Sequence, residues 1–144
     1  MRISTKGRYG LRAMVDMAIN ASEGPMPLRV IAERQGISDS YLEQVFTSLR
    51  KNGLVNASRG AQGGYELSRS ATEISVGDIL RSLEGPLAPV HCVEPNSKPC
   101  DNQKNCITYS FWAELRDKID DLVDQTTLQN LADRSTKNQG TYHI

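Results

Sequence analysis

The sequence lacks the features that membrane proteins and disulfide-rich secreted proteins require. Its 144 residues contain no run of 18 consecutive apolar residues, and the first ten residues are not followed by the apolar stretch of a signal peptide. Cysteine is scarce as well, and an odd count of three argues against a disulfide framework. We therefore expect a cytoplasmic chain without a membrane anchor, large enough for one hydrophobic core and a smaller appendage.

The residues that many enzymes use for catalysis are also rare. Only His91 and His143 are histidines, no Cys-x-x-Cys pair occurs, and the glycine-rich stretch at 60–64 lies in an expected hairpin rather than before a helix. His91 precedes Cys92, but the sequence shows no third group that would orient an activated thiol. We expect a protein that is not an enzyme. The alternative is a thiol redox catalyst or a small electron carrier, which turnover independent of DNA would favour.

The whole chain has no formal net charge, but its two halves carry charges of opposite sign. Residues 1–70 hold ten Lys and Arg against six Asp and Glu, whereas residues 71–144 hold seven against eleven. The first half could therefore face the phosphates of a nucleic acid, and the second half would repel them. A basic excess of this size is also common on solvated surfaces, so charge alone does not decide between the two.

Two helices are expected before residue 36. An apolar pattern over residues 5–22 follows a Ser-Thr pair that can cap a helix, and it ends before Gly24. A shorter helix is expected over residues 28–35, where Gly36 would let the chain reverse direction. Ile37 would then be the apolar residue that fills the turn.

A third helix is expected to begin at Ser38 or Ser40. Ser40 and Glu43 have the spacing of a capping box, and an apolar stripe continues to residue 49. A helix, a short glycine turn and a second helix form the pattern of a helix-turn-helix, whose second helix enters a major groove of DNA. The polar residues at its start are of the types that contact base edges and phosphates: Ser38, Ser40, Tyr41, Glu43 and Gln44.

A β-hairpin is expected next, over residues 54–68. Two short alternating segments flank a glycine-rich turn, and Arg59 stands where that turn begins. A hairpin after a helix-turn-helix is a wing, and an arginine there can enter a narrow minor groove. The alternative is that the polar residues merely cap a surface helix and that the winged helix contacts another protein.

The second half of the chain predicts a capped helix, a loop and a long helix. Ser75 would cap a helix that stops at Gly85, and residues 86–106 hold four prolines without apolar periodicity. From Ile107 to Asp124 the apolar residues share one helical face, which could bury against this chain or against a second copy. We expect a short final turn at 126–131 and a frayed polar end beyond Asp133.

All three cysteines lie in this proline-rich loop, as Cys92, Cys100 and Cys106. Soft thiolates in one loop suit zinc, copper or an iron–sulfur cluster. Structural zinc sites usually contain Cys-x2-4-Cys pairs, which are absent here, so a cluster is favoured. The alternatives are incidental reduced cysteines and a zinc-stabilised module that binds other proteins.

Four motifs resemble the IscR/NsrR/CymR family of winged-helix regulators. They are MRISTKGRYG at 1–10, ISDSYLEQ at 37–44, LRKNGLV at 49–55 and RGAQGGY at 59–65, and the likeness continues to the cysteines and the last long helix. The resemblance implies a homodimer, with the long helix packed across a two-fold axis. It also implies operator contacts by the five polar residues named above, with Arg59 in the minor groove.

By the same resemblance, Cys92, Cys100 and Cys106 hold an iron–sulfur cluster, with two irons and two sulfurs favoured over four of each. The sequence departs from the family in its slightly longer cysteine spacing and in Tyr109, which replaces a histidine. Arg8 stands where some members have an aspartate ligand. The fourth ligand therefore stays open among His91, Asp101, an acidic residue of the second subunit, and an external thiol or water.

These expectations give a mainly α fold with a small β-hairpin wing. The parts are a winged helix-turn-helix at 1–85, a cysteine-bearing sensor loop at 86–106, a dimerisation helix at 107–133 and a flexible tail at 134–144. The expected function is a dimeric regulator, mainly a repressor, whose operator binding depends on a cluster and which governs cluster assembly or sulfur metabolism. The alternative is a repressor of cysteine metabolism that resembles CymR, carries no cluster and responds to cysteine synthase.

Overall fold

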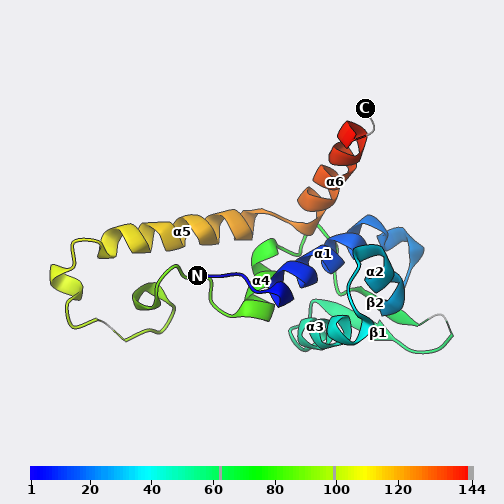
Figure 1. Cartoon of the computed structure of the whole chain (residues 1–144), viewed down its shortest axis with the longest axis horizontal. Helices are drawn as coiled ribbons and strands as arrows, with labels where there is room; N and C mark the ends of the chain where they lie inside the picture. Colours follow the sequence, from blue (N-terminus) through cyan, green and yellow to red (C-terminus); the bar gives the residue numbers. More distant parts are fainter. Residues whose placement is uncertain (62, 99, 143–144) are drawn as a thin grey trace.

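The computed structural model describes residues 1–61, 63–98 and 100–142, and the side chains through residue 135. Figure 1 shows α1, α2, α3 and the β-hairpin gathered in one body, with α4 beside them and α5 extending away. The elements in chain order are α1 (Thr5–Ile19), η1 (Ala21–Glu23), α2 (Leu28–Gln35), α3 (Asp39–Lys51), β1 (Val55–Ser58), β2 (Gly64–Leu67), α4 (Val76–Glu84), η2 (His91–Val93), η3 (Gln103–Asn105), α5 (Tyr109–Gln125) and α6 (Leu128–Tyr142).

The main core lies between α1, α2, α3 and the hairpin. Met14, Ile31 and Phe46 are fully buried there, one from each of the three helices. The ring of Phe46 also meets that of Tyr65 on β2 edge to face, at a centroid distance of 5.1 Å. The core thereby fixes the hairpin against the helix that precedes it, as a winged helix requires.

The turn between α2 and α3 has the conformation expected of Gly36. This residue adopts a left-handed backbone with φ of 65°, which only glycine reaches without steric cost, and Ile37 is buried directly after it. Of the two predicted starts of α3, Ser38 is confirmed as the N-cap, and its hydroxyl accepts a hydrogen bond from the backbone N–H of Tyr41 at 3.3 Å. The capping box with the spacing of Ser40 and Glu43 is not formed.

The hairpin pairs β1 and β2 antiparallel, with Val55 opposite Leu67 and Ser58 opposite Gly64. It is also attached to the start of α2, because the backbones of Met26 and Tyr65 exchange two hydrogen bonds of 2.9 and 2.8 Å. The wing therefore belongs to the same rigid body as the helix-turn-helix.

In the second half of the chain, the predicted capped fourth helix is confirmed, but the prediction of a structureless loop after it is wrong. Ser75 and Asp78 form a capping box at the start of α4. The loop is not structureless: it contains the short helices η2 and η3, and Leu87 and Val93 are buried.

The helix boundaries also need correction. The first helix ends at Ile19 rather than at residue 22, and a one-turn helix follows. The expected long helix is α5, which ends at Gln125, and the expected short turn after it is α6, which runs on through Tyr142. The frayed end predicted beyond Asp133 is helical as far as residue 142, and residues 143–144 lie outside the described part.

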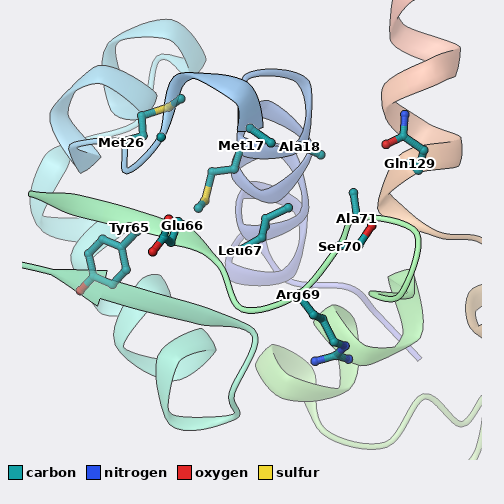
Figure 2. A pocket seen from close by; sticks show the side chains of 12 residues that line it. Met17, Ala18, Met26, Tyr65, Glu66, Leu67, Arg69, Ser70, Ala71 and Gln129 are labelled. Carbon is teal, nitrogen blue, oxygen red and sulfur yellow. The ribbon is translucent and has the colours of Figure 1, made fainter.

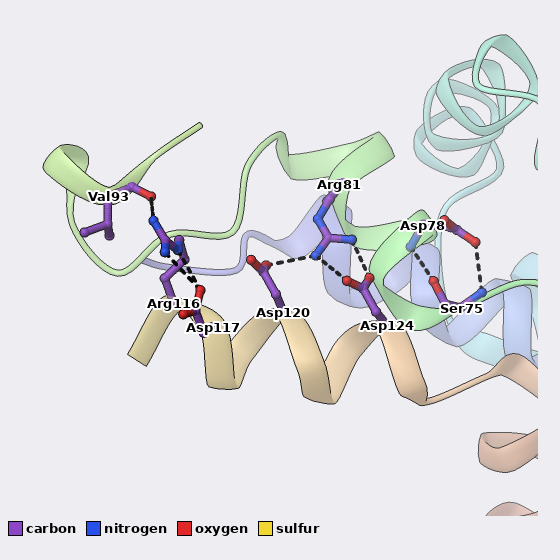
Figure 3. A network of polar contacts seen from close by, with 8 residues as sticks. All are labelled: Ser75, Asp78, Arg81, Val93, Arg116, Asp117, Asp120 and Asp124. Carbon is purple, nitrogen blue, oxygen red and sulfur yellow. Dashed lines mark hydrogen bonds and ion pairs between the residues drawn. The ribbon is translucent and has the colours of Figure 1, made fainter. Parts of the chain in front are cut away.

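Helix α5 is attached to α4 by charged side chains (Figure 3). The Arg81 guanidinium donates to Asp124 at 2.5 and 3.1 Å and to Asp120 at 2.9 Å, and these bonds, with Asp124 first, raise the pKa of Arg81 above its usual value. Nearer the start of α5, Arg116 donates to the carbonyl of Val93 at 3.3 Å. The two arginines hold α5 to α4 and to the first part of the cysteine loop.

Within the described ranges, no helix is both long enough and apolar enough to span a bilayer.

Candidate nucleic-acid interface

The start of α3 presents a polar surface. Ser40, Glu43 and Gln44 are exposed, and they lie on the side of the helix opposite its buried residues. Ser38 is exposed as well, although its hydroxyl already serves as the helix cap. This surface offers hydroxyl, amide and carboxylate groups to a base edge, which is the chemistry of direct readout.

Tyr41 differs from the other four predicted contact residues, because it is half-buried and already has partners. Its hydroxyl lies 3.1 Å from the Thr5 hydroxyl, and its ring meets the Tyr9 ring edge to face at 6.0 Å. The structure thus places Tyr41 between the recognition helix and the start of α1. No local pattern predicted the Thr5 contact, which joins residues 36 positions apart.

Arg59 lies on the wing, at the start of the turn between β1 and β2. It is exposed, and Gly60 follows it with φ of 107°. A shallow groove of about 540 Å³ separates the base of this wing from α2 and α3. Arg29 and Thr47 line this groove together with Glu43, and neither was among the predicted contact residues. The sequence could have suggested Arg29 as a contact residue, because it is a cation at the start of the helix expected over residues 28–35.

A buried polar network joins α1 to the end of α2, just before the turn. The Asp16 carboxylate is only 5% exposed and accepts from Arg34 at 2.6 and 3.0 Å and from Gln35 at 2.9 Å. The Asp16 hydrogen bond raises the pKa of Arg34. Arg12 adds a bond of 2.7 Å to the Gln35 carbonyl, so the last turn of α2 is held from two positions on α1.

A separate pocket of about 310 Å³ lies behind the wing, between α1, β2 and α6 (Figure 2). Several polar side chains that line this pocket already form hydrogen bonds with other residues. Arg69 donates to Asp78 and to the Glu73 carbonyl, and Gln129 donates to Asp133. We assign no ligand to this pocket.

The three cysteines are free thiols in different settings. Cys92 is half-buried in η2, next to the buried Val93, whereas Cys100 and Cys106 are exposed in the later part of the loop. The Thr108 hydroxyl, 3.5 Å from the Cys106 sulfur, lowers the pKa of that thiol. The first part of the loop is thus packed and the second is accessible.

The described part of the chain contains no group of three or more His, Cys, Asp or Glu side chains placed to hold a metal ion. The donor set itself fits a soft metal or cluster, because three thiols share one loop and two of them are exposed. Gathering them requires the exposed part of the loop to move toward Cys92. The predicted ligands are therefore present but not preorganised.

The chain matches the Rrf2 family, described as an iron-dependent transcriptional regulator, over residues 3–134. The HTH-type transcriptional regulator IscR of Pectobacterium carotovorum subsp. carotovorum (strain PC1) is 45% identical over 131 residues, which cover 91% of this chain and 79% of that protein. IscR of Escherichia coli O1:K1 / APEC is 42% identical over the same length, with 91% and 80% covered.

Solved structures give the same result for the fold. T. potens IscR superimposes with a TM-score of 0.78 at 42% identity, covering 96% of this chain and 91% of that one. CymR of B. subtilis, the global cysteine regulator, gives 0.77 at 42% identity, covering 93% and 98%. These relatives confirm the predicted mainly α fold with a small wing, and their names confirm a regulator rather than an enzyme. The chain belongs to the Rrf2 family of transcriptional regulators.

Proposed function

We propose that this regulator binds operator DNA as a homodimer in the cytoplasm and represses transcription, with an iron–sulfur cluster controlling its binding. The observation that supports it most directly is the exposed polar start of α3 beside a wing that carries Arg59. The recognition helix would enter a major groove, and Arg59 would enter the adjacent minor groove. Base contacts would come from Ser40, Glu43 and Gln44, and Ser38 would contact the backbone.

Tyr41 has a different role in this proposal. Its hydroxyl is engaged by Thr5 and its ring by Tyr9, so it serves first to hold the recognition helix against α1. Contact with the operator would be secondary for this residue.

A homodimer is supported by the surface of α5 and of the residues just before it. Phe111 and Leu122 of α5 are 55% and 67% exposed and the preceding Ile107 is 95% exposed, which leaves large apolar side chains in water on the monomer. Figure 1 shows α5 projecting from the body, where a second copy can reach it. Two copies would also supply two reading helices for two half-sites.

The DNA-binding test starts from a duplex that the wild-type protein selects from a random library. Arg59→Ala should weaken binding of this duplex by about tenfold or more and reduce the salt dependence by about one phosphate contact. Arg134→Ala is the matched control, since Arg134 is exposed on α6. Equal losses in the two variants, or binding that ignores sequence, would reject the proposed interface.

The dimer test compares two substitutions on exposed positions of α5. Leu122→Glu should shift sedimentation toward the monomer, because it places a charge in the proposed interface. Ser110→Glu adds the same side chain at an exposed position on another face of the helix and should leave the dimer intact. If the wild-type protein sediments as a monomer at micromolar concentration, the proposal of a homodimer is rejected.

For the cluster, we propose Cys92, Cys100 and Cys106 as the protein's thiolate ligands. Bound iron and sulfide would add a redox-sensitive link between parts of the loop that are separate in the free chain. Protein prepared without oxygen should contain iron and sulfide and absorb visible light, and each Cys→Ser variant should lose both. Lys98→Ala, at an exposed position in the same loop, should retain them. A colourless, iron-free wild-type protein would reject the cluster.

The similarity to CymR supports a second candidate function. CymR of B. subtilis aligns over 98% of its length, and this chain does not hold its thiols together. A repressor of cysteine metabolism controlled by cysteine synthase would need no cluster. Iron-free protein that binds its operator, and changes affinity when purified cysteine synthase is added, would favour this function.

A further inference from the structure

The N-terminus of α1 is capped by a residue from another helix. The backbone N–H groups of Ser4 and Gly7 donate to one carboxylate oxygen of Glu84 at 2.9 and 3.0 Å, and the Ser4 hydroxyl donates to the same oxygen at 2.5 Å. Ser4 occupies the N-cap position, but its own side chain makes no capping bond. Glu84 therefore satisfies two backbone N–H groups at the start of α1 and opposes the positive end of the helix dipole.

Gly7 is required for this close approach. A Cβ atom added at Gly7 would collide with the carboxylate oxygen of Glu84 and press on its Cγ and on Ile3. The carboxylate is the movable end of a side chain, so alanine at this position would displace it rather than the helix. Because alanine itself favours a helix, such a change removes the contact without weakening α1 by propensity.

The capped turn lies between the cysteine loop and the recognition helix. Glu84 is the last residue of α4, where the chain leaves toward the cysteine loop, and the N-terminal amine of Met1 donates to the Pro89 carbonyl of that loop at 3.2 Å. On its other side, Thr5 contacts the Tyr41 hydroxyl at the start of α3. A contiguous set of contacts thus runs from the loop, through Glu84 and the first turn of α1, to Tyr41.

We propose that Glu84 is a positioning residue for the recognition helix. Its carboxylate fixes the first turn of α1, so that Thr5 and Tyr9 hold Tyr41, and with it the start of α3, in one orientation. Loss of the carboxylate contact frees that turn and lets α3 vary its angle in the groove. The inference rests on the proposed DNA-binding function, because the consequence is a loss of discrimination between DNA sequences.

Hydrogen exchange tests the positioning step without DNA. Glu84→Ala and Gly7→Ala should speed amide exchange in peptides covering residues 1–10 and also in those covering 38–45. Glu73→Ala is the matched control, because Glu73 is exposed and its carboxylate has no hydrogen bond among the described residues. Faster exchange confined to residues 1–10 would overturn the proposal, since it would show a local cap without transmission to α3.

Binding measurements test the consequence. The selected duplex and a copy with one base pair changed in each half-site are compared for all variants. Glu84→Ala and Gly7→Ala should reduce the wild-type ratio of the two affinities by about tenfold, a typical allosteric coupling. Thr5→Val, which removes the hydroxyl that contacts Tyr41, should reduce it as well and add little in combination with Glu84→Ala.

Two failures can be told apart in this design. If the wild-type protein itself shows no sequence preference, the proposed function fails and the inference falls with it. If the wild type discriminates and every variant keeps the same ratio, only the role of Glu84 is overturned. Thermal unfolding of each variant separates a loss of positioning from a general loss of stability.

Discussion

At the scale of single residues, Asp16 is the buried acid on which the helix-turn-helix depends. It accepts hydrogen bonds from Arg34 and Gln35 at the end of α2, and it is 5% exposed. The sequence showed only an acid within an apolar helix, because its partners lie 18 and 19 positions further along the chain. Burial of a charge is stable only with such partners, so the packing decided this role.

Asp16→Asn should lower the free energy of unfolding by about 1 to 3 kcal/mol, since it leaves donors of Arg34 and Gln35 without a charged acceptor. The lower part of this range is favoured because the Arg34 side chain is 37% exposed and can reach water. Urea unfolding measures the loss. Asp121→Asn, at an exposed position of α5, is the control and should have little effect. Equal stabilities for the two variants would contradict the network's role.

Cys106 should be the more reactive of the two exposed thiols. The Thr108 hydroxyl lowers the pKa of Cys106, so its thiolate, which is the nucleophile, forms at a lower pH than that of an ordinary cysteine. In iron-free protein, alkylation followed by mass spectrometry should modify Cys106 faster than Cys100 near neutral pH. Thr108→Val should shift the pH profile of the Cys106 rate upward. Equal rates for both thiols, unaffected by this change, would contradict the prediction.

At the scale of elements, α5 docks on α4 through side chains that are only partly buried. Ile119 and Val123 pack against an apolar cluster on α4, Arg81 binds Asp120 and Asp124, and no residue of α5 falls in the buried class. The apolar stripe predicted the helix and its amphipathic face, but not that much of this face would remain in water. Periodicity specifies which residues share a face, and it does not specify what covers that face.

Arg81→Gln should loosen α5 by removing its ion pairs with α4. All three side chains are partly exposed, with 35%, 38% and 48% accessible for Arg81, Asp120 and Asp124, so the loss of stability should be only about 1 kcal/mol. Hydrogen exchange should increase over residues 109–125 and stay unchanged in α2 and α3. Arg134→Gln serves as the control on α6. If the amides of α5 exchange as slowly in the Arg81→Gln variant as in the wild type, apolar contacts rather than these ion pairs hold α5 to α4.

At the scale of the whole molecule, the start of α6 packs into the core that the N-terminal half of the chain forms. Leu128 at the start of α6 is fully buried in the main core, and Ala132 is buried one turn later. Figure 1 shows the cysteine loop leading the chain away and α5 bringing it back, so that α6 begins beside α1. The sequence suggested only a short turn here, because the segment is mostly polar and the few apolar residues do not reveal their distant partner.

Leu128→Ala should therefore destabilise the winged-helix body, although the residue lies far from it in sequence. Truncation of a fully buried leucine costs about 2 to 5 kcal/mol. The loss should appear in urea unfolding at a fixed protein concentration, which keeps any dimerisation constant. Ile19→Ala removes an apolar side chain that is 46% exposed, and its cost should be clearly smaller, at about 1 kcal/mol or less. A Leu128 effect as small as that of Ile19 would contradict the packing.

The sequence by itself determined the features that depend on neighbouring residues. Gly36 set the turn of the helix-turn-helix, the hairpin followed from alternation around a glycine-rich turn, and Ser75 capped α4 as predicted. These features depend on backbone conformation and periodicity, which are local properties. The motifs at 1–10, 37–44, 49–55 and 59–65 also identified the family.

Only the tertiary structure decided which distant groups meet. It gave Tyr41 its partner Thr5, placed Glu84 at the start of α1, returned Leu128 to the core, and left Cys92 apart from the exposed thiols. Each of these contacts, or its absence, depends on how the helices pack rather than on the order of residues along them. Packing is a property of the whole assembled chain, so no local pattern could have specified it.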